Sequence, residues 1–217
     1  MRVEQLIEHI ETKLSRPGIL SELADIIASG ASTAGKRPEE VFTRDFLCPL
    51  IADFFYNSHR DKNLSDKEIS DGLGTEGYEK AKGFGFRPAR EIPHVFTKSE
   101  IVSSRVPDSW TKSRNPARKQ ACPDFAIRKP LPLCVVGDVK FFKSESSKTA
   151  VKALYDAARE MVFYLGVYGR EYDDALIVVA DASPSHAFDQ GMKLIHRDIL
   201  SRFGAQSRIY LAVARLS

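Results

Sequence analysis

The chain has 217 residues, 43% of them hydrophobic and 28% charged, which supplies one sizeable core and predicts a single domain over residues 1–217. The formal net charge of +3 is too small to indicate a polyanionic partner by itself. The three cysteines are odd in number and far apart in sequence, which excludes a disulfide framework and a metal-binding knuckle and is typical of a reducing compartment.

The first part of the chain, residues 1–60, is predicted to be helical. Apolar residues recur at helical spacing in "MRVEQLIEHIETKLSR", and a second short helix follows in "ILSELADIIAS". A third helix is predicted over "PEEVFTRDFLCPLIADFFYN", with Pro38 at its start and a kink at Pro49. The opening segment lacks the apolar core of a signal peptide, and no apolar run reaches the roughly 20 residues of a membrane span. We therefore expect a cytoplasmic protein that does not enter the membrane.

The next segment, residues 57–87, is polar and rich in glycine. It contains "GLGTEG", which matches the spacing of a dinucleotide-binding fingerprint. That motif requires a buried strand before it, and the preceding "NLSDKEISD" is not one. The segment is therefore interpreted as a loop. A first strand is predicted in "AREIPHVFT", followed by a polar insertion over residues 97–121.

The C-terminal part, from about residue 88 to 217, is predicted to be the α/β core. Two strands are predicted around 123–129 and 133–142, followed by a helix in "SSKTAVKALYDAAREMVFYLGVYG" and a strand in "DALIVVADAS". A further helix around 186–203 and a strand in "SRIYLAVARL" end the chain. The hairpin implies antiparallel pairing and the strand–helix–strand unit implies a right-handed parallel crossover. The predicted fold is therefore a central mixed β-sheet flanked by helices.

Three charged residues stand out in the apolar hairpin "CPDFAIRKPLPLCVVGDVKFF". If the turn "KPLP" is centred on Leu131, Asp124 lies opposite Asp138 across the two strands. Lys140 is two residues beyond Asp138 and shares its face. The three side chains are thus predicted to converge on one patch.

Two adjacent carboxylates repel each other unless positive charge lies between them. Lys140 supplies part of that charge, and Mg²⁺, which prefers carboxylate, carbonyl and water oxygens, would supply the rest. Such a centre hydrolyses phosphodiesters, because the metal acidifies a bound water and the ammonium stabilises developing charge. The alternative is a structural ion pair in which Lys140 only neutralises the acids. The apolar strand favours the first interpretation, because burying charge there is costly and stability does not require it.

The arrangement Pro123-Asp124 … Asp138-Val139-Lys140 resembles the PD-(D/E)xK nuclease superfamily, which includes many type II restriction endonucleases. The resemblance covers about residues 38–181 and implies a restriction-endonuclease-like core. It also implies Mg²⁺ held by the two acids and by the backbone carbonyl of Val139.

Many members of that superfamily add a glutamate from the helix before the first strand. Glu40 is the residue we choose, because a glutamate one helical turn before an arginine is similar to the family pattern, and Arg44 has that spacing. Glu39, Asp45 and Glu22 are the other candidates. Alternatively, Glu40 only complements the helix dipole.

A basic stretch precedes and enters the hairpin. Between Arg105 and Lys129 there are seven basic residues against two acidic ones, which suits contact with a phosphate backbone. A solvated loop with incidental charge is the alternative. The predicted DNA-binding residues are Arg105, Lys112, Arg114, Arg118 and Lys119.

Together these features predict a Mg²⁺-dependent endodeoxyribonuclease that acts on double-stranded DNA. Its size resembles that of a type II restriction endonuclease, which would act as a homodimer on a palindromic site. A structure-selective, repair or phage-defence nuclease of the same fold is one alternative. A non-catalytic DNA-binding module is the other.

Overall fold

The computed structural model describes most of the N-terminal helical part, most of the β1–β2 hairpin region and most of the C-terminal part. The described residues are 1–31, 37–59, 124–127, 129, 131–143, 146–168, 172–184, 188–189 and 208–217. The predicted glycine-rich loop, the first strand in "AREIPHVFT", the polar insertion and nearly all of the helix at 186–203 lie outside these ranges.

The N-terminal part is helical, as predicted. It contains α1 (Val3–Leu14), α2 (Ile19–Ser29), α3 (Pro38–Val41), the π-helical turn η1 (Phe42–Leu47) and α4 (Cys48–His59). The predicted third helix is therefore continuous but changes its winding just before Pro49. Proline lacks the N–H that would bond to the carbonyl four residues earlier, and its ring crowds that carbonyl. A wider turn accommodates both effects, and the Cys48 N–H accordingly bonds to the Thr43 carbonyl, five residues back.

The C-terminal part is α/β. It contains β1 (Phe125–Ile127), β2 (Val135–Phe142), α7 (Ser147–Tyr168), β3 (Asp174–Asp181) and β4 (Ile209–Arg215). The strands form one sheet in the order β1-β2-β3-β4. β1 pairs antiparallel with β2, while β2 with β3 and β3 with β4 are parallel pairs. The predicted mixed sheet with a parallel crossover through α7 is confirmed.

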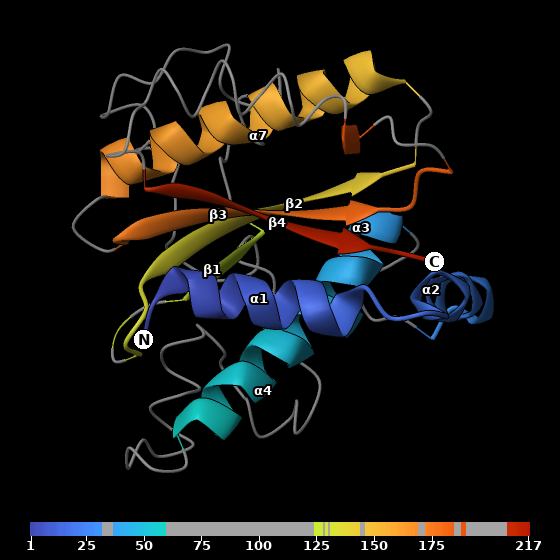
Figure 1. Cartoon of the computed structure of the whole chain (residues 1–217), viewed down its shortest axis with the longest axis horizontal. Helices are drawn as coiled ribbons and strands as arrows, with labels where there is room; N and C mark the ends of the chain where they lie inside the picture. The colour runs from blue at the N-terminus through green and yellow to red at the C-terminus, as the bar shows by residue number, and fades with distance from the viewer. Residues whose placement is uncertain are drawn as a thin grey trace.

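Helices cover both faces of this sheet. In Figure 1, α7 lies over one face, and α1 and α4 lie over the other. The side chains of β2 alternate accordingly: Val136 and Phe142 pack with the core beneath α7, whereas Val135 and Val139 pack with the core formed by α1 and α4. Asp138 and Lys140 have the same parity as Val136, so their side chains project toward the α7 side.

Along the edge of β4 that faces away from β3, two backbone N–H groups bond to side chains of the N-terminal helical part. The Val213 N–H donates to a carboxylate oxygen of Glu11 at 2.9 Å, and the Arg215 N–H donates to the Ser15 hydroxyl at 2.9 Å. These bonds occupy backbone donors that an edge strand would otherwise present to another chain. None of the helices in the described ranges is long and apolar enough to cross a membrane.

Gly137, which precedes Asp138, is packed against the aromatic ring of Phe125. The two residues are cross-strand partners, and a Cβ atom added at Gly137 would lie 1.9 Å from Cζ of that ring. Because Phe125 is fully buried, the ring has no solvent to move into. Close approach of β1 to β2, and thus of Asp124 to Asp138, depends on this glycine.

We predict that Gly137→Ala destabilises the fold by about 1–3 kcal/mol, the usual effect of overpacking a core. Thermal unfolding in the absence of metal measures the effect. The matched test is Gly137→Ala combined with Phe125→Leu, which shortens the opposing side chain and should recover part of the loss. An alanine variant as stable as the wild type would contradict the packing described here.

Candidate functional site

Asp124, Asp138 and Lys140, the acid–lysine cluster, lie at the point where β1 meets β2. The pairs Phe125–Gly137, Ala126–Val136 and Ile127–Val135 establish the predicted register. Asp124 is the residue immediately before β1, and its N–H donates to the Gly137 carbonyl at 2.9 Å. Its carboxylate oxygen Oδ2 accepts the Val139 N–H at 2.8 Å. The hairpin therefore brings the two acids together as the sequence predicted.

Asp138 is the most deeply buried member of the cluster. It is 0% exposed, whereas the side chain of Lys140 is 16% exposed. The Lys140 ammonium forms an ion pair with the Asp138 carboxylate. Beyond this ion pair and the adjoining carboxyl group of Asp124, no hydrogen-bond donor reaches either carboxylate oxygen of Asp138 within the described residues. A fully buried carboxylate with such incomplete hydrogen bonding is energetically costly.

The carboxyl group of Asp124 is also buried, and burial disfavours its charged form. Asp124 is partly exposed as a residue, but its carboxyl group is enclosed by protein atoms. Burial, and next the charge of Asp138 and a hydrogen bond between the two carboxyl groups, raise the pKa of Asp124 well above its ordinary value. The Val139 N–H and the charge of Lys140 act in the opposite direction but do not outweigh these effects. In the absence of metal, the fold thus favours the protonated form of Asp124.

Lys140 is held in the charged form by the surrounding acids. Burial alone would lower its pKa, but the charge of Asp138 and then that of Glu160 outweigh this effect and raise the pKa above its ordinary value. Glu160 lies on α7, and the sequence analysis did not identify it. Glu160 is only partly buried, although its neighbours Ala157, Met161 and Tyr164 are buried, so the pattern of α7 does not single it out.

The cluster fits a hard divalent cation. The two carboxyl groups adjoin each other, and within the described residues the oxygens of Asp138 meet only the carboxyl group of Asp124 and the Lys140 ammonium. The Val139 N–H donates to Asp124, and because the N–H and carbonyl of a strand residue project to the same edge of the strand, the Val139 carbonyl also faces the β1 edge of β2. Within the described residues, no three acidic, histidine or cysteine side chains gather as a metal site. Mg²⁺ needs no more than one or two carboxylates, because it retains several waters.

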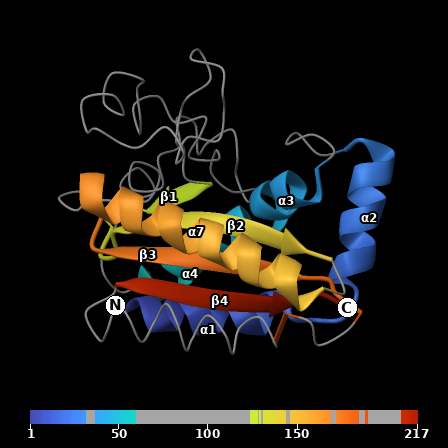
Figure 2. The same ribbon diagram turned by 90° about the horizontal axis from the view of Figure 1, so that it is seen from above.

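Glu40 lies on α3, the short helix that contacts β2. Figure 2 shows α3 beside β2, on the side of the sheet where β1 lies. Glu40 is 19% exposed in its side chain and lies 3.9 Å from Arg37. Among the alternatives, Glu22 accepts a bidentate pair of hydrogen bonds from the Arg16 guanidinium. Asp45 lies in η1, and no hydrogen bond within the described residues reaches its buried oxygen Oδ2. Whether Glu40 or Asp45 adds to the cluster stays a prediction.

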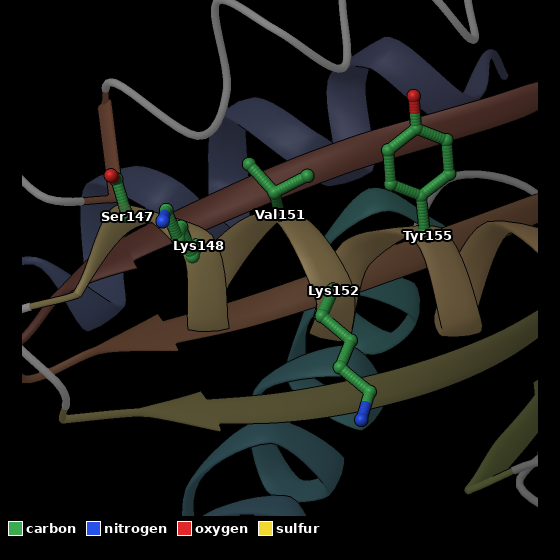
Figure 3. Close-up of a pocket in the computed structure, with 5 residues that line it drawn as sticks. All are labelled: Ser147, Lys148, Val151, Lys152 and Tyr155. Carbon is green, nitrogen blue, oxygen red and sulfur yellow. The ribbon is translucent and has the colours of Figure 1, made fainter.

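A groove runs along the N-terminal half of α7. It has a volume of about 410 Å³ and is lined by Ser147, Lys148, Val151, Lys152 and Tyr155. In Figure 3, Val151 and Tyr155 project to one side of the helix and Lys152 to the other. None of the lining residues belongs to the acid–lysine cluster, so the groove is a separate feature.

The predicted DNA-binding residues, from Arg105 to Lys119, lie outside the described residues. No family model matches the sequence, and no curated protein matches it. The function therefore has to be inferred from the chemistry of the cluster.

Proposed function

We propose that this protein is a Mg²⁺-dependent endodeoxyribonuclease with a restriction-endonuclease-like core of the PD-(D/E)xK type. The observation that supports this best is the buried carboxylate of Asp138, which adjoins a second acid, Asp124, and forms an ion pair with Lys140. A structural ion pair would gain little from two adjoining acids that repel each other. A cation site explains why a second acid adjoins the buried carboxylate.

In this proposal each residue of the cluster has a separate task. Asp124 and Asp138, with the backbone carbonyl of Val139, hold the cation, which when bound polarises a phosphoryl oxygen and acidifies water. The ammonium of Lys140 orients the attacking water and stabilises negative charge that develops on the phosphoryl group. The basic residues from Arg105 to Lys119 hold the phosphate backbone. Glu40 completes the acidic set from α3.

The substrate we propose is double-stranded DNA cut at a specific sequence, as in type II restriction endonucleases, with a homodimer acting on a palindromic site. Mixed-sheet topology and the α7 crossover are compatible with this fold. Structure-selective cleavage and binding without cleavage are the outcomes that would replace the restriction activity.

The test is incubation of the purified protein with unmethylated phage and plasmid DNA in Mg²⁺ or in EDTA. We expect discrete fragments in Mg²⁺ and intact DNA in EDTA. Asp138→Asn should abolish cleavage, whereas Asp156→Asn, which changes an exposed acid on α7, should not. A Mg²⁺-dependent smear would remove the sequence-specific activity but keep the nuclease. No cleavage of duplex, branched or single-stranded DNA would overturn the proposal.

A further inference from the structure

β4 ends the four-stranded sheet of the described residues, and only one of its edges pairs with β3. The Leu216 N–H donates to the Asp181 carbonyl at 2.8 Å, and the Arg208 carbonyl accepts the Ala175 N–H at 2.7 Å. Even-numbered residues of this segment therefore direct their backbone groups toward β3. Since successive residues of a strand bond toward opposite edges, the odd-numbered residues present theirs at the outer edge. These outward residues are Ile209, Leu211, Val213 and Arg215.

Two of the four outward N–H groups are bonded to side chains at the end of α1. Glu11, in the last turn of α1, accepts the Val213 N–H at 2.9 Å through its carboxylate oxygen Oε1. Ser15, the residue that follows α1, accepts the Arg215 N–H at 2.9 Å through its hydroxyl. Figures 1 and 2 both show α1 beside β4. These two side chains, the edge caps, leave at most two outward N–H groups of β4 available to another strand.

The sequence of β4, IYLAVAR, is suited to pairing with itself. Its first six residues are apolar or aromatic, carry no charge and include neither glycine nor proline, which is typical of segments that associate strand to strand. In an antiparallel pair centred on Ala212, Leu211 lies opposite Val213 of a second copy. Ile209 then lies opposite Arg215, so the two arginines are kept apart. All outward backbone groups would find partners in this two-fold symmetric pair.

We propose that Glu11 and Ser15 keep the outer edge of β4 from pairing with the β4 strand of a second copy of this chain. That pair needs the Val213 and Arg215 N–H groups, which are the two that the edge caps occupy. An edge strand with free donors is a template for another chain, and native proteins commonly block such edges. The inference does not rest on the proposed function, and it leaves the other surfaces of the protein for the proposed homodimer.

The first test is self-association, measured by sedimentation velocity over a range of protein concentrations in EDTA. Glu11→Ala should strengthen association by at least about tenfold, because it frees one N–H in each copy and each new hydrogen bond contributes a factor of several. Glu11→Gln keeps a side-chain carbonyl that can accept the Val213 N–H, so it should stay within about twofold of the wild type. Glu8→Ala removes the same charge from an exposed position one turn earlier and should behave likewise. If the wild type is a dimer, the step measured is the next association.

The second test asks whether the copies meet through β4. Leu211→Pro removes an outward N–H, and proline is tolerated in an edge strand where the N–H faces away from the sheet. In the Glu11→Ala background it should return association to the wild-type level. Ser15→Ala removes the other edge cap and should also strengthen association. Circular dichroism monitors the fold, and Ser15→Ala decides the question if Glu11→Ala does not fold.

Three results would overturn the inference about β4. One is that the variant lacking an edge cap, Glu11→Ala or Ser15→Ala in its place, associates no more strongly than Glu8→Ala. Another is equally strong association of Glu11→Gln and Glu11→Ala, because charge and not the hydrogen bond would then be responsible. The third is association that persists with Leu211→Pro, since the copies would then meet elsewhere. None of these measurements uses DNA cleavage, so they fail or succeed independently of the proposed nuclease activity.

Discussion

Lys140→Ala is expected to reduce Mg²⁺-dependent DNA cleavage by about a thousandfold. The ammonium contributes a fixed positive charge in an interior site, and loss of one such stabilising group typically costs two to three orders of magnitude in rate. The strand places it beside the two acids, with only 16% of its side chain exposed, so bulk water cannot replace it well. Single-turnover cleavage with excess enzyme measures the chemical step without product release.

The matched control is Lys143→Ala. Lys143 is three residues further along, just beyond the end of β2, and is exposed. Its replacement should leave the cleavage rate within about twofold of the wild type, because surface charges seldom contribute more. Wild-type cleavage by Lys140→Ala would reject the assignment of this site.

A loss of cleavage in Lys140→Ala must be separated from a loss of structure. The substitution leaves Asp138 buried without its cation, which commonly costs about 3–5 kcal/mol. Lys140→Arg keeps a positive charge next to Asp138 and should therefore preserve the fold. We expect it to cleave poorly as well, because a planar guanidinium does not place its donors where an ammonium does.

The geometry of the hairpin could be predicted from sequence because its signals are local. A turn centred on Leu131 was assumed, and the register that follows from it places Asp124 opposite Asp138. The charged residues were conspicuous against the apolar strand. The structure confirms the register and adds the Asp124–Val139 hydrogen bond, which depends on backbone geometry at the end of β1.

Glu160 could not be predicted in the same way. An acid on a long amphipathic helix usually faces solvent, and the sequence of α7 does not reveal how the helix is rotated about its axis over β2. Its effect on the pKa of Lys140 depends on how α7 packs against β2, because the two residues are twenty positions apart in sequence. The turn η1 shows a similar limit: Pro49 indicated where the helix would change, but whether by a kink or by wider winding depended on packing.

Asp124→Asn is expected to stabilise the metal-free protein while abolishing cleavage. The asparagine oxygen can still accept the Val139 N–H, and its amide can donate to Asp138 in place of a repelling carboxylate. We expect a gain of about 0.5–2 kcal/mol, the common range for a single stabilising substitution. Cleavage is lost because a neutral amide is a weaker ligand for Mg²⁺ than a carboxylate.

The gain in stability should depend on pH in a defined direction. The pKa of Asp124 is raised in the folded protein above its ordinary value of 3.8, so the fold favours the protonated acid. This contribution to stability is present in the wild type below the unfolded pKa and is lost as the pH rises through the folded pKa. In EDTA, the melting temperature of Asp124→Asn should therefore exceed that of the wild type by little at acidic pH and by more at neutral pH.

Added Mg²⁺ should reverse the order of stability between the two proteins. Ligand binding to the folded state stabilises the wild type by mass action, whereas the variant has lost one of the two side-chain ligands. Thermal unfolding of both proteins across pH, in EDTA and in Mg²⁺, measures both effects in one series, with exposed Asp173→Asn as the control. If Asp124→Asn melted below the wild type in EDTA at neutral pH, the two carboxyl groups would not repel each other. If it gained as much from Mg²⁺ as the wild type does, Asp124 would not hold the cation.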